Sequence, residues 1–355
     1  MVDSAPMTAT AHEAALIVGA GPIGLACAVS ARRRGGDPLV VDAGAIANSI
    51  VHYPIGMVFF TTPERLEIGG HPLVSAGSKA TREEALKYYR GVVRAEGIRV
   101  RPFTRLVGAE RQGARVFCRL RTQLGEESLS CDRLVLATGY FDHPNRLDVP
   151  GEDLPHVSHY FEEPHLTAGQ DVVVVGGKNS AAEAALLAFR AGARVTLVYR
   201  RPELRPSVKY WLRPDLLNRI KAGEIRARLG AEVVEVTPRD VVIQRGRAAE
   251  RQDGTVERIP ADRVYALTGY HPDFDLFQAI GIRFDDQTGR PALDPQTLET
   301  NVPGVHLAGS VTAGRNISEV FIENGRFDGE KIFGDQASRA RAEALYAATL
   351  RAVDE

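Results

Sequence analysis

An apolar run, a glycine-rich turn and an alanine-rich segment follow one another twice in this chain. The first copy, AALIVGAGPIGLACAVSARRR, begins at Ala14, and the second, DVVVVGGKNSAAEAALLAFR, begins at Asp171. Each copy predicts a buried strand, a tight turn, a helix and another buried strand, which together open a doubly wound βαβ domain. The sequence therefore predicts an α/β protein with two Rossmann-like dinucleotide-binding domains. The predicted strands are residues 15–18, 39–41, 172–175 and 195–199, and the predicted first helix is residues 23–34.

The order of the remaining segments predicts that one domain is inserted in the other. Each copy is followed by strands that end in a similar phrase, LVLATGYFDHP at 134–144 and VYALTGYHPDF at 264–274. A further apolar segment at 304–308 then leads into a stretch with helical spacing from about Ile317. We therefore predict one domain made of residues 14–150 and 271–355, and a second domain of residues 151–270 inserted in it.

The first turn carries the G-x-G-x-x-G fingerprint of dinucleotide-binding domains in Gly19, Gly21 and Gly24. The first glycine permits the tight turn, the second lets the backbone approach a diphosphate, and the third lets the helix pack closely on the strand. Asp42 ends the next predicted strand, 23 positions after Gly19, where a carboxylate can accept hydrogen bonds from ribose hydroxyls. These residues predict that the first domain binds FAD.

The second turn departs from the fingerprint in two ways. Lys178 occupies the position of the second glycine, and the residue 23 positions after Gly176 is Tyr199, followed by Arg200 and Arg201. An acid at this strand end would repel a 2′-phosphate, whereas guanidinium groups bind one through paired hydrogen bonds. The second domain is therefore predicted to bind NADPH, which would reduce the flavin by hydride transfer.

The C-terminal segment is predicted to complete the flavin site. A helix from about Ile317, capped by Ser318 with Phe321 and Ile322 directed inward, would place its positive N-terminal end near the flavin pyrimidine. The predicted cofactor-binding residues are Gly19, Gly21, Pro22, Ile23, Gly24, Asp42, Ser49, Tyr53, Thr138, Gly139, Gly176, Gly177, Lys178, Asn179, Ser180, Arg200, Arg201, Gly309, Ser310 and Ile317.

Composition excludes several other classes of protein. With 44 Lys and Arg against 45 Asp and Glu, the chain has no basic field for nucleic acid or an anionic membrane. No apolar run approaches the roughly 20 residues of a membrane span, and the first residues lack the pattern of a signal peptide. The three cysteines form no C-x-x-C pair and no metal-ligand pattern. We expect a cytoplasmic protein without a bound metal.

The whole chain resembles the thioredoxin-reductase-like flavoproteins, but it lacks the Cys-x-x-Cys that those enzymes carry in the NADPH domain. From about residue 14 to 335 it resembles the bacillithiol disulfide reductases more closely. The phrases that carry this resemblance are HYP at 52–54, LEIGGHPL at 66–73, ALKYYR at 85–90, GGKNSAAEAAL at 176–186, GYHPDF at 269–274 and FIENGRFDG at 321–329. The resemblance implies an oxidoreductase of redox homeostasis that uses FAD and NADPH. It further implies reduction of a small-molecule disulfide, bacillithiol disulfide, without a protein dithiol, and we expect a homo-oligomer.

One position departs from that family. Its members carry a cysteine in the first fingerprint where this chain has Ile23. Cys27 follows one helical turn later and is the remaining candidate for a catalytic thiol, although a cysteine in an alanine-rich helix is more often a core residue. His52 is a second catalytic candidate because its phrase has no evident packing role. The wider set of candidates for a substrate entrance is His52, Tyr53, His71, Lys79, Arg82 and Arg315.

Three other functions stay open from the sequence. Ferredoxin/flavodoxin-type NADPH reductases of the thioredoxin-reductase type also lack the dithiol, but their acidic partners favour a basic surface that the balanced composition does not predict. VPG at 149–151 followed by His156 is a weak match to the linker of flavoprotein monooxygenases. A flavin-bound redox sensor without turnover is the fourth possibility.

Overall fold

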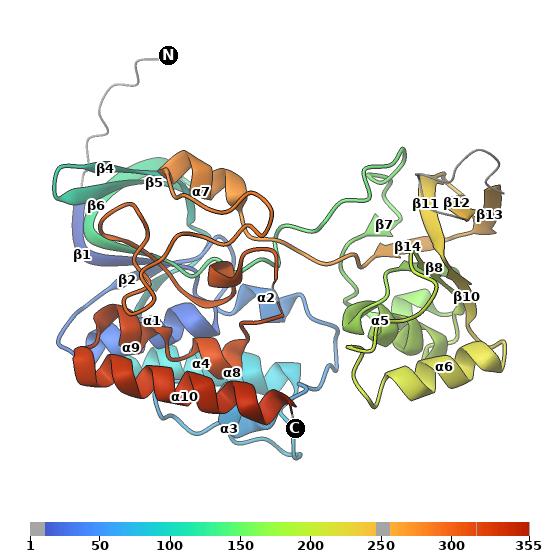
Figure 1. Ribbon diagram of the computed structural model, residues 1–355, viewed down its shortest axis with the longest axis horizontal. Coiled ribbons are helices and arrows are strands. Elements are labelled where there is room, and N and C mark those ends of the chain that lie inside the picture. The colour runs from blue at the N-terminus through green and yellow to red at the C-terminus, as the bar shows by residue number, and fades with distance from the viewer. Residues whose placement is uncertain (1–10, 246–255, 317, 355) are drawn as a thin grey trace, which may run out of the picture. The chain divides into compact units, whose positions relative to one another are not determined.

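The computed structural model describes residues 11–245, 256–316 and 318–354 (Figure 1). These residues divide into two compact units. The first unit comprises residues 11–51, 56–143 and 270–354, and the second comprises residues 52–55, 144–245 and 256–269. In chain order the second unit thus interrupts the first. Its main segment begins at Pro144 rather than at the predicted residue 151. The short segment 52–55 also belongs to the second unit, which the sequence did not indicate.

The first unit is built on a seven-stranded sheet with the order β3-β2-β1-β6-β5-β4, in which β15 also pairs with β6. Strands β1, β2, β3, β6 and β15 run parallel, so their carboxyl ends share one edge. Strand β5 pairs antiparallel with both of its neighbours, β6 and β4. The strands are β1 (Ala11–Val18), β2 (Leu39–Val41), β3 (Arg99–Arg101), β4 (Arg105–Gln112), β5 (Arg115–Thr122), β6 (Gly125–Leu136) and β15 (Val305–Leu307).

The first unit also contains helices, and capping residues set the ends of one of the longer ones. The longest before the C-terminus, α4, starts at a reciprocal capping box between Thr81 and Glu84 and stops at Gly97, whose φ of 61° is left-handed. A Cβ at Gly329 would lie 2.8 Å from Cα of Cys27, so α9 and α1 pack backbone to backbone. The helices are α1 (Pro22–Arg32), α2 (Asn48–Val51), α3 (Pro63–Leu66), α4 (Arg82–Glu96), α7 (Phe274–Ile280), α8 (Ile322–Gly325), α9 (Asp328–Phe333) and α10 (Gln336–Asp354), with a 3₁₀ helix, η3, at Gly309–Ala313.

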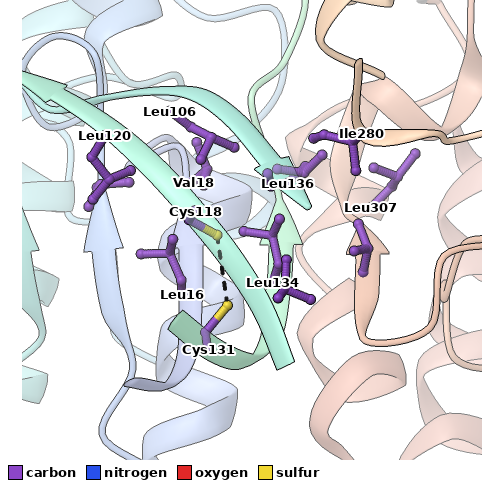
Figure 2. Close-up of a cluster of buried hydrophobic side chains, with 14 of the residues drawn as sticks. Leu16, Val18, Leu106, Cys118, Leu120, Cys131, Leu134, Leu136, Ile280 and Leu307 are labelled. Atoms are coloured by element: carbon purple, nitrogen blue, oxygen red, sulfur yellow. Dashed lines mark hydrogen bonds between the residues drawn. The ribbon is translucent and has the colours of Figure 1, made fainter. Parts of the chain in front are cut away.

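The core of the first unit lies against the long strands of its sheet. Figure 2 shows Leu16, Leu134 and Leu307 packed there with the two cysteines Cys118 and Cys131. The two sulfur atoms lie 4.0 Å apart between β5 and β6, and both side chains are fully buried. The hydrogen bond to Cys131 and burial raise the pKa of the Cys118 thiol, so this pair packs as a small apolar cluster.

The second unit contains a five-stranded parallel sheet with the order β10-β9-β8-β14-β7 and a separate three-stranded antiparallel sheet, β11-β12-β13. The buried alanines of α5 let that helix lie close on β8 and β9, as the sequence predicts for a βαβ unit. The elements are β7 (Val157–Ser158), η1 (Pro164–Thr167), β8 (Asp171–Val175), α5 (Asn179–Arg190), β9 (Arg194–Tyr199), α6 (Arg213–Lys221), β10 (Arg226–Leu229), β11 (Ala231–Val236), β12 (Asp240–Arg245), β13 (Val256–Pro260) and β14 (Arg263–Ala266).

The predicted helix from about Ile317 begins later in the structure. Ile317 itself lies outside the described residues, and the first helix of this region, α8, starts at Ile322. The cause is the side chain of Asn324, which accepts a hydrogen bond of 2.8 Å from the N–H of Phe321 and donates one to the carbonyl of Glu319. These bonds hold the segment before α8 in an extended conformation.

Two side chains predicted to support that helix have other roles. The Ser318 hydroxyl donates to the side chain of Asn316 at 3.2 Å and does not cap the helix. Phe321, predicted to face inward, is 44% exposed. The prediction of a single continuous helix here is therefore wrong, because α8 ends at Gly325 and α9 starts at Asp328.

Candidate functional site

The first glycine turn has the geometry that a diphosphate requires. Gly19 has a φ of +108°, and a Cβ there would lie 2.3 Å from the carbonyl oxygen of Ala137. A Cβ at Gly24 would lie 1.9 Å from the carbonyl oxygen of Gly19, so neither position tolerates a side chain. At Gly21 a Cβ would meet nothing within 4 Å, and Pro22 begins α1 directly after it. The turn thus leaves open space beside a helix N-terminus, where backbone N–H groups bind phosphate.

The carboxylate of Asp42 is held rigidly at the end of β2. Its oxygens accept hydrogen bonds from the N–H groups of Ala20, at 2.7 Å, and Gly44, at 2.8 Å. Burial raises the pKa of Asp42, while the bonds from Gly44 and Ala20 act in the opposite direction. Each carboxylate oxygen has a further lone pair, so Asp42 retains the capacity to accept a ribose hydroxyl.

The phrase after β6 brings a buried hydroxyl to the same edge of the sheet. Thr138 Oγ1 is buried and has no hydrogen-bond partner among the described residues. Its neighbour Gly139 has a φ of +68°, and a Cβ there would meet nothing within 4 Å. A buried hydroxyl without a partner is a group that a polar ligand can satisfy. Together with the first turn and Asp42, these residues fit an FAD molecule in the first unit.

Ile23, which replaces the cysteine of the resembling family, is a packing residue. A Cβ at Gly325 would lie 2.5 Å from Cδ1 of Ile23, and one at Gly309 would lie 3.1 Å from its Cγ1. The isoleucine therefore fills the space between α1, η3 and α8. Gly309 is fixed in addition by its N–H, which donates to the buried carboxylate of Asp328 at 2.7 Å. Ser310 lies next in η3, partly exposed.

The structure argues against the prediction that Cys27 is catalytic. Its side chain is fully buried in α1. Burial raises the pKa of the thiol well above its ordinary value, and the carboxylates of Asp328 and Glu330 raise it further. A disulfide-reducing cysteine must be accessible and must reach the thiolate form, and the burial of Cys27 opposes both. Since Cys118 and Cys131 are buried as well, the chain presents no thiol at its surface.

At the second glycine turn, other protein atoms fill the space beside two of the glycines. Gly176 has a φ of +149°, and a Cβ there would lie 2.5 Å from the carbonyl oxygen of Leu267. A Cβ at Gly177 would lie 2.4 Å from the ring of Tyr199, so this glycine admits the tyrosine that ends β9. Lys178 precedes α5 with a φ of −112°, an ordinary extended conformation in which a lysine is not strained. The replacement of the second glycine by lysine is thus compatible with the turn.

A cluster of positive charges lies at this turn. The pKa of Lys178 is lowered, first by burial and then by the like charges of Arg205, Arg201 and Arg200. Across the described ranges, none of these four side chains forms an ion pair or a hydrogen bond with a protein carboxylate. Cations gathered without a counter-charge favour an anionic ligand, and guanidinium groups suit a phosphate. The sequence reasoning missed Arg205, which the phrase RRPELR at 200–205 could have indicated.

The side chain of Asn179 connects the second glycine turn to a neighbouring loop. Its Oδ1 accepts a hydrogen bond of 2.9 Å from the N–H of Lys209. This bond ties the start of α5 to the loop between β9 and α6, which carries Arg205. Ser180 is exposed on the first turn of α5.

The residues predicted for a substrate entrance are mostly engaged in separate local contacts. His52 Nδ1 lies 2.7 Å from Oε1 of Glu162, and the N–H of Ile55 donates to the carbonyl of Glu162 at 2.7 Å, all within the second unit. In the first unit, His71 pairs with Glu96 at 2.7 Å, Arg82 pairs with Glu83 at 2.8 Å and Arg315 lies over the ring of Phe274. Ser49 lies on α2, and Tyr53 belongs to the segment 52–55.

The chain is thus an α/β protein with two dinucleotide-type turns, one followed by an acid and one by a cluster of cations. The model of the pyridine nucleotide-disulphide oxidoreductase family matches residues 16–309. The chain is 42% identical over 328 residues to bacilliredoxin reductase Bdr of Bacillus subtilis (strain 168), a match that covers 92% of this chain and 98% of that protein. The chain therefore belongs to the pyridine nucleotide-disulphide oxidoreductases and, within them, to the bacilliredoxin and bacillithiol disulfide reductases.

Solved structures agree with this assignment. The bacillithiol disulfide reductase of Bacillus cereus is 40% identical, with a TM-score of 0.87 over 93% of this chain and 99% of that one. The corresponding enzyme of Staphylococcus aureus is 34% identical, with a TM-score of 0.85 over 96% and 99%. The thioredoxin reductase of T. acidophilum is 20% identical with a TM-score of 0.70, which establishes the shared fold alone.

The ferredoxin-reductase alternative has a more distant relative. A ferredoxin–NADP reductase of Ignicoccus hospitalis is 28% identical over 84% of this chain and 90% of its own length, well below the disulfide reductases. Membership of the family implies an oxidoreductase that uses FAD and NADPH.

In the described part of the chain, none of the helices is both long and apolar enough to cross a bilayer. The same ranges contain no group of three or more His, Cys, Asp and Glu residues arranged to hold a metal.

Proposed function

We propose that this chain is an NADPH-dependent flavoenzyme that reduces a low-molecular-weight disulfide, bacillithiol disulfide being the preferred substrate. The observation that carries the proposal is the contrast between the two strand ends. Asp42 stands after β2 of the first unit, and Arg200 and Arg201 stand after β9 of the second. The names of the solved relatives from Bacillus cereus and Staphylococcus aureus supply the substrate.

Each of the two units would bind one of the two cofactors. In the first unit, the turn at Gly21, the carboxylate of Asp42 and the hydroxyl of Thr138 would hold the diphosphate, a ribose and a further polar group of FAD. In the second unit, Lys178 and the arginines at 200, 201 and 205 would bind the 2′-phosphate of NADPH. FAD, when bound, supplies a centre that takes two electrons from NADPH and gives them to an acceptor.

The electrons reach the substrate without a protein thiol in this proposal. All three cysteines are buried, so no protein dithiol is available for thiol–disulfide exchange. Reduction of a disulfide takes two electrons and two protons and yields two thiols. We propose His52, paired with Glu162 at 2.7 Å and exposed to solvent, as the group that holds a proton for the departing thiolate.

A second candidate acceptor is the disulfide of a small redox protein. The Bacillus subtilis relative, 42% identical to this chain, is named as a reductase of bacilliredoxin. A flavin site without a protein thiol is compatible with either acceptor. The finer expectations of a homo-oligomer in the reducing cytoplasm belong to this proposal too, and sedimentation of the purified holoenzyme checks the first of them.

The test is a parallel assay of the purified protein. We expect a yellow protein that oxidises NADPH much faster than NADH when bacillithiol disulfide is the acceptor. Glutathione disulfide, an oxidised bacilliredoxin, a ferredoxin and oxygen serve as comparison acceptors under the same conditions. Reduction of ferredoxin with no reduction of any disulfide would overturn the proposal, and faster reduction of bacilliredoxin than of the free disulfide would favour the second candidate.

A further inference from the structure

Phe103 combines two properties that packing alone does not explain. It follows β3 with a φ of 52°, in the left-handed region that a bulky residue rarely occupies, and it is 52% exposed. In the described residues its ring takes part in no aromatic pair and no contact with a cation. A strained backbone that presents an apolar ring to solvent is stable only where the surroundings enforce it, and such strain gathers at binding sites.

The backbone around Phe103 is fastened to the loop that carries Asp42. The N–H of Phe103 donates to the carbonyl of Gly44 at 3.0 Å, and the N–H of Thr104 donates to the carbonyl of Asp42 at 2.7 Å. On the other side, the N–H of Asp42 donates to the carbonyl of Arg101 at 3.2 Å. The ends of β2 and β3 are thus joined by three hydrogen bonds, which fix Phe103 beside the proposed ribose-binding carboxylate.

The order of the strands sets the direction of a dinucleotide along this edge. Neighbouring strands run β1, β2, β3, all parallel, so Gly21, Asp42 and Phe103 follow one another outward along the carboxyl edge of the sheet. A diphosphate at the first turn and a ribose at Asp42 place the next group of the chain, the base, near β3. A flat aromatic ring is a suitable surface for a purine, because the two π-faces stack.

We propose that Phe103 is a binding residue for the adenine ring of FAD. The inference rests on the proposed function, because it takes the first unit to be the FAD site. The left-handed backbone at residue 103 is retained for the orientation that it gives the ring, at the expense of local strain. An asparagine or glycine at this position would adopt the same backbone more easily but would offer no aromatic face.

The test measures FAD affinity of the apoprotein, not turnover. We would remove the flavin from wild-type protein and from Phe103→Ala, Phe103→Asn and Phe103→Tyr, and titrate each with FAD by quenching of flavin fluorescence. We expect the dissociation constant to rise about 5- to 30-fold in the Ala and Asn variants and to stay near wild type in the Tyr variant. Leu124→Ala is the matched control, because Leu124 is also in the first unit and is 100% exposed.

Two further measurements separate a binding role from a structural one. FMN lacks the adenosine half, so its affinity should be the same in all of these proteins. The melting temperature of apo Phe103→Asn should equal or exceed that of the wild type, since asparagine relieves the strain. Unchanged FAD affinity in Phe103→Ala and Phe103→Asn, or an equal loss of FMN affinity, would overturn the inference. Wild-type apoprotein that binds no FAD would instead overturn the proposed function.

Discussion

The side chain of Asn179 accepts a hydrogen bond of 2.9 Å from the backbone N–H of Lys209, thirty residues further along the chain. Asn179 opens α5 directly after the second glycine turn, and Lys209 lies in the loop that follows β9. The bond therefore links the proposed diphosphate site to the loop that holds Arg205. In the proposed NADPH site, recognition of a 2′-phosphate would therefore involve this loop as well as the arginines at the strand end.

Replacing Asn179 by alanine should loosen that loop. We expect the KM for NADPH to rise about 3- to 10-fold, the effect of one lost hydrogen bond, with kcat little changed. The KM for NADH should change less, because NADH has no 2′-phosphate for Arg205 to contact. Steady-state kinetics with both coenzymes measures the difference. Asn218→Ala, an exposed asparagine on α6, is the matched control, and an equal rise for both coenzymes would contradict the explanation.

Replacing Arg201 by alanine should change the choice of coenzyme more directly. Loss of a charge-assisted contact to the 2′-phosphate should raise the KM for NADPH about ten- to a hundredfold. The KM for NADH should stay the same or fall, since the variant also relieves repulsion among the cations around Lys178. Arg258→Ala, which removes an exposed arginine from β13 of the same unit, controls for net charge. A preference for NADPH that survives in Arg200→Ala/Arg201→Ala would contradict the assignment of the phosphate site.

Asp328 should make the stability of the protein depend on pH. Burial raises the pKa of this carboxyl to about 7, above its ordinary value near 3.8, while the hydrogen bond from Gly309 and the charge of Lys331 act in the opposite direction. Because the folded state binds the proton more tightly than the unfolded state, stability falls as the pH rises from about 4 to 7, by up to about 4 kcal/mol.

The variant Asp328→Asn isolates this contribution. Its amide oxygen can still accept the hydrogen bond from Gly309, but it has no charge to bury. We expect the variant to be more stable than the wild type at pH 8 and to lose that advantage toward pH 4. Urea unfolding of both proteins at several pH values measures the difference in free energy. A difference that does not vary with pH would show that Asp328 titrates normally in the folded state.

The burial of Cys27 leads to a prediction about catalysis. Cys27→Ala should retain the turnover of the wild type with a disulfide acceptor and lower stability by about 1 kcal/mol, the effect of a small cavity. Cys27→Ser should lower stability more, by about 1–3 kcal/mol, because it buries a hydroxyl. Turnover per bound flavin separates the two effects. A large loss of turnover in the alanine variant with a full complement of flavin would restore Cys27 as a redox residue.

The local parts of the fold could be predicted from the sequence. Strands β1, β2, β8 and β9 and helices α1 and α5 lie where the apolar runs and glycine spacings indicate, because a βαβ unit is specified by neighbouring residues. The two strand ends, Asp42 and Arg200 with Arg201, and the family resemblance could likewise be identified from short phrases. These features need only the chemistry of adjacent positions.

Other features depend on residues that are distant along the chain. Close packing with α9, some 300 residues later, helps to seal Cys27 from solvent, and the side chain of Asn324 moves the start of the last helices from about Ile317 to Ile322. The ring of Tyr199 lies against Gly177, and segment 52–55 joins the second unit. The sequence thus determined the class of the protein and its two nucleotide-binding turns. The tertiary structure alone decided which side chains are exposed and how they are oriented, because burial and long-range hydrogen bonds arise only when distant segments pack together.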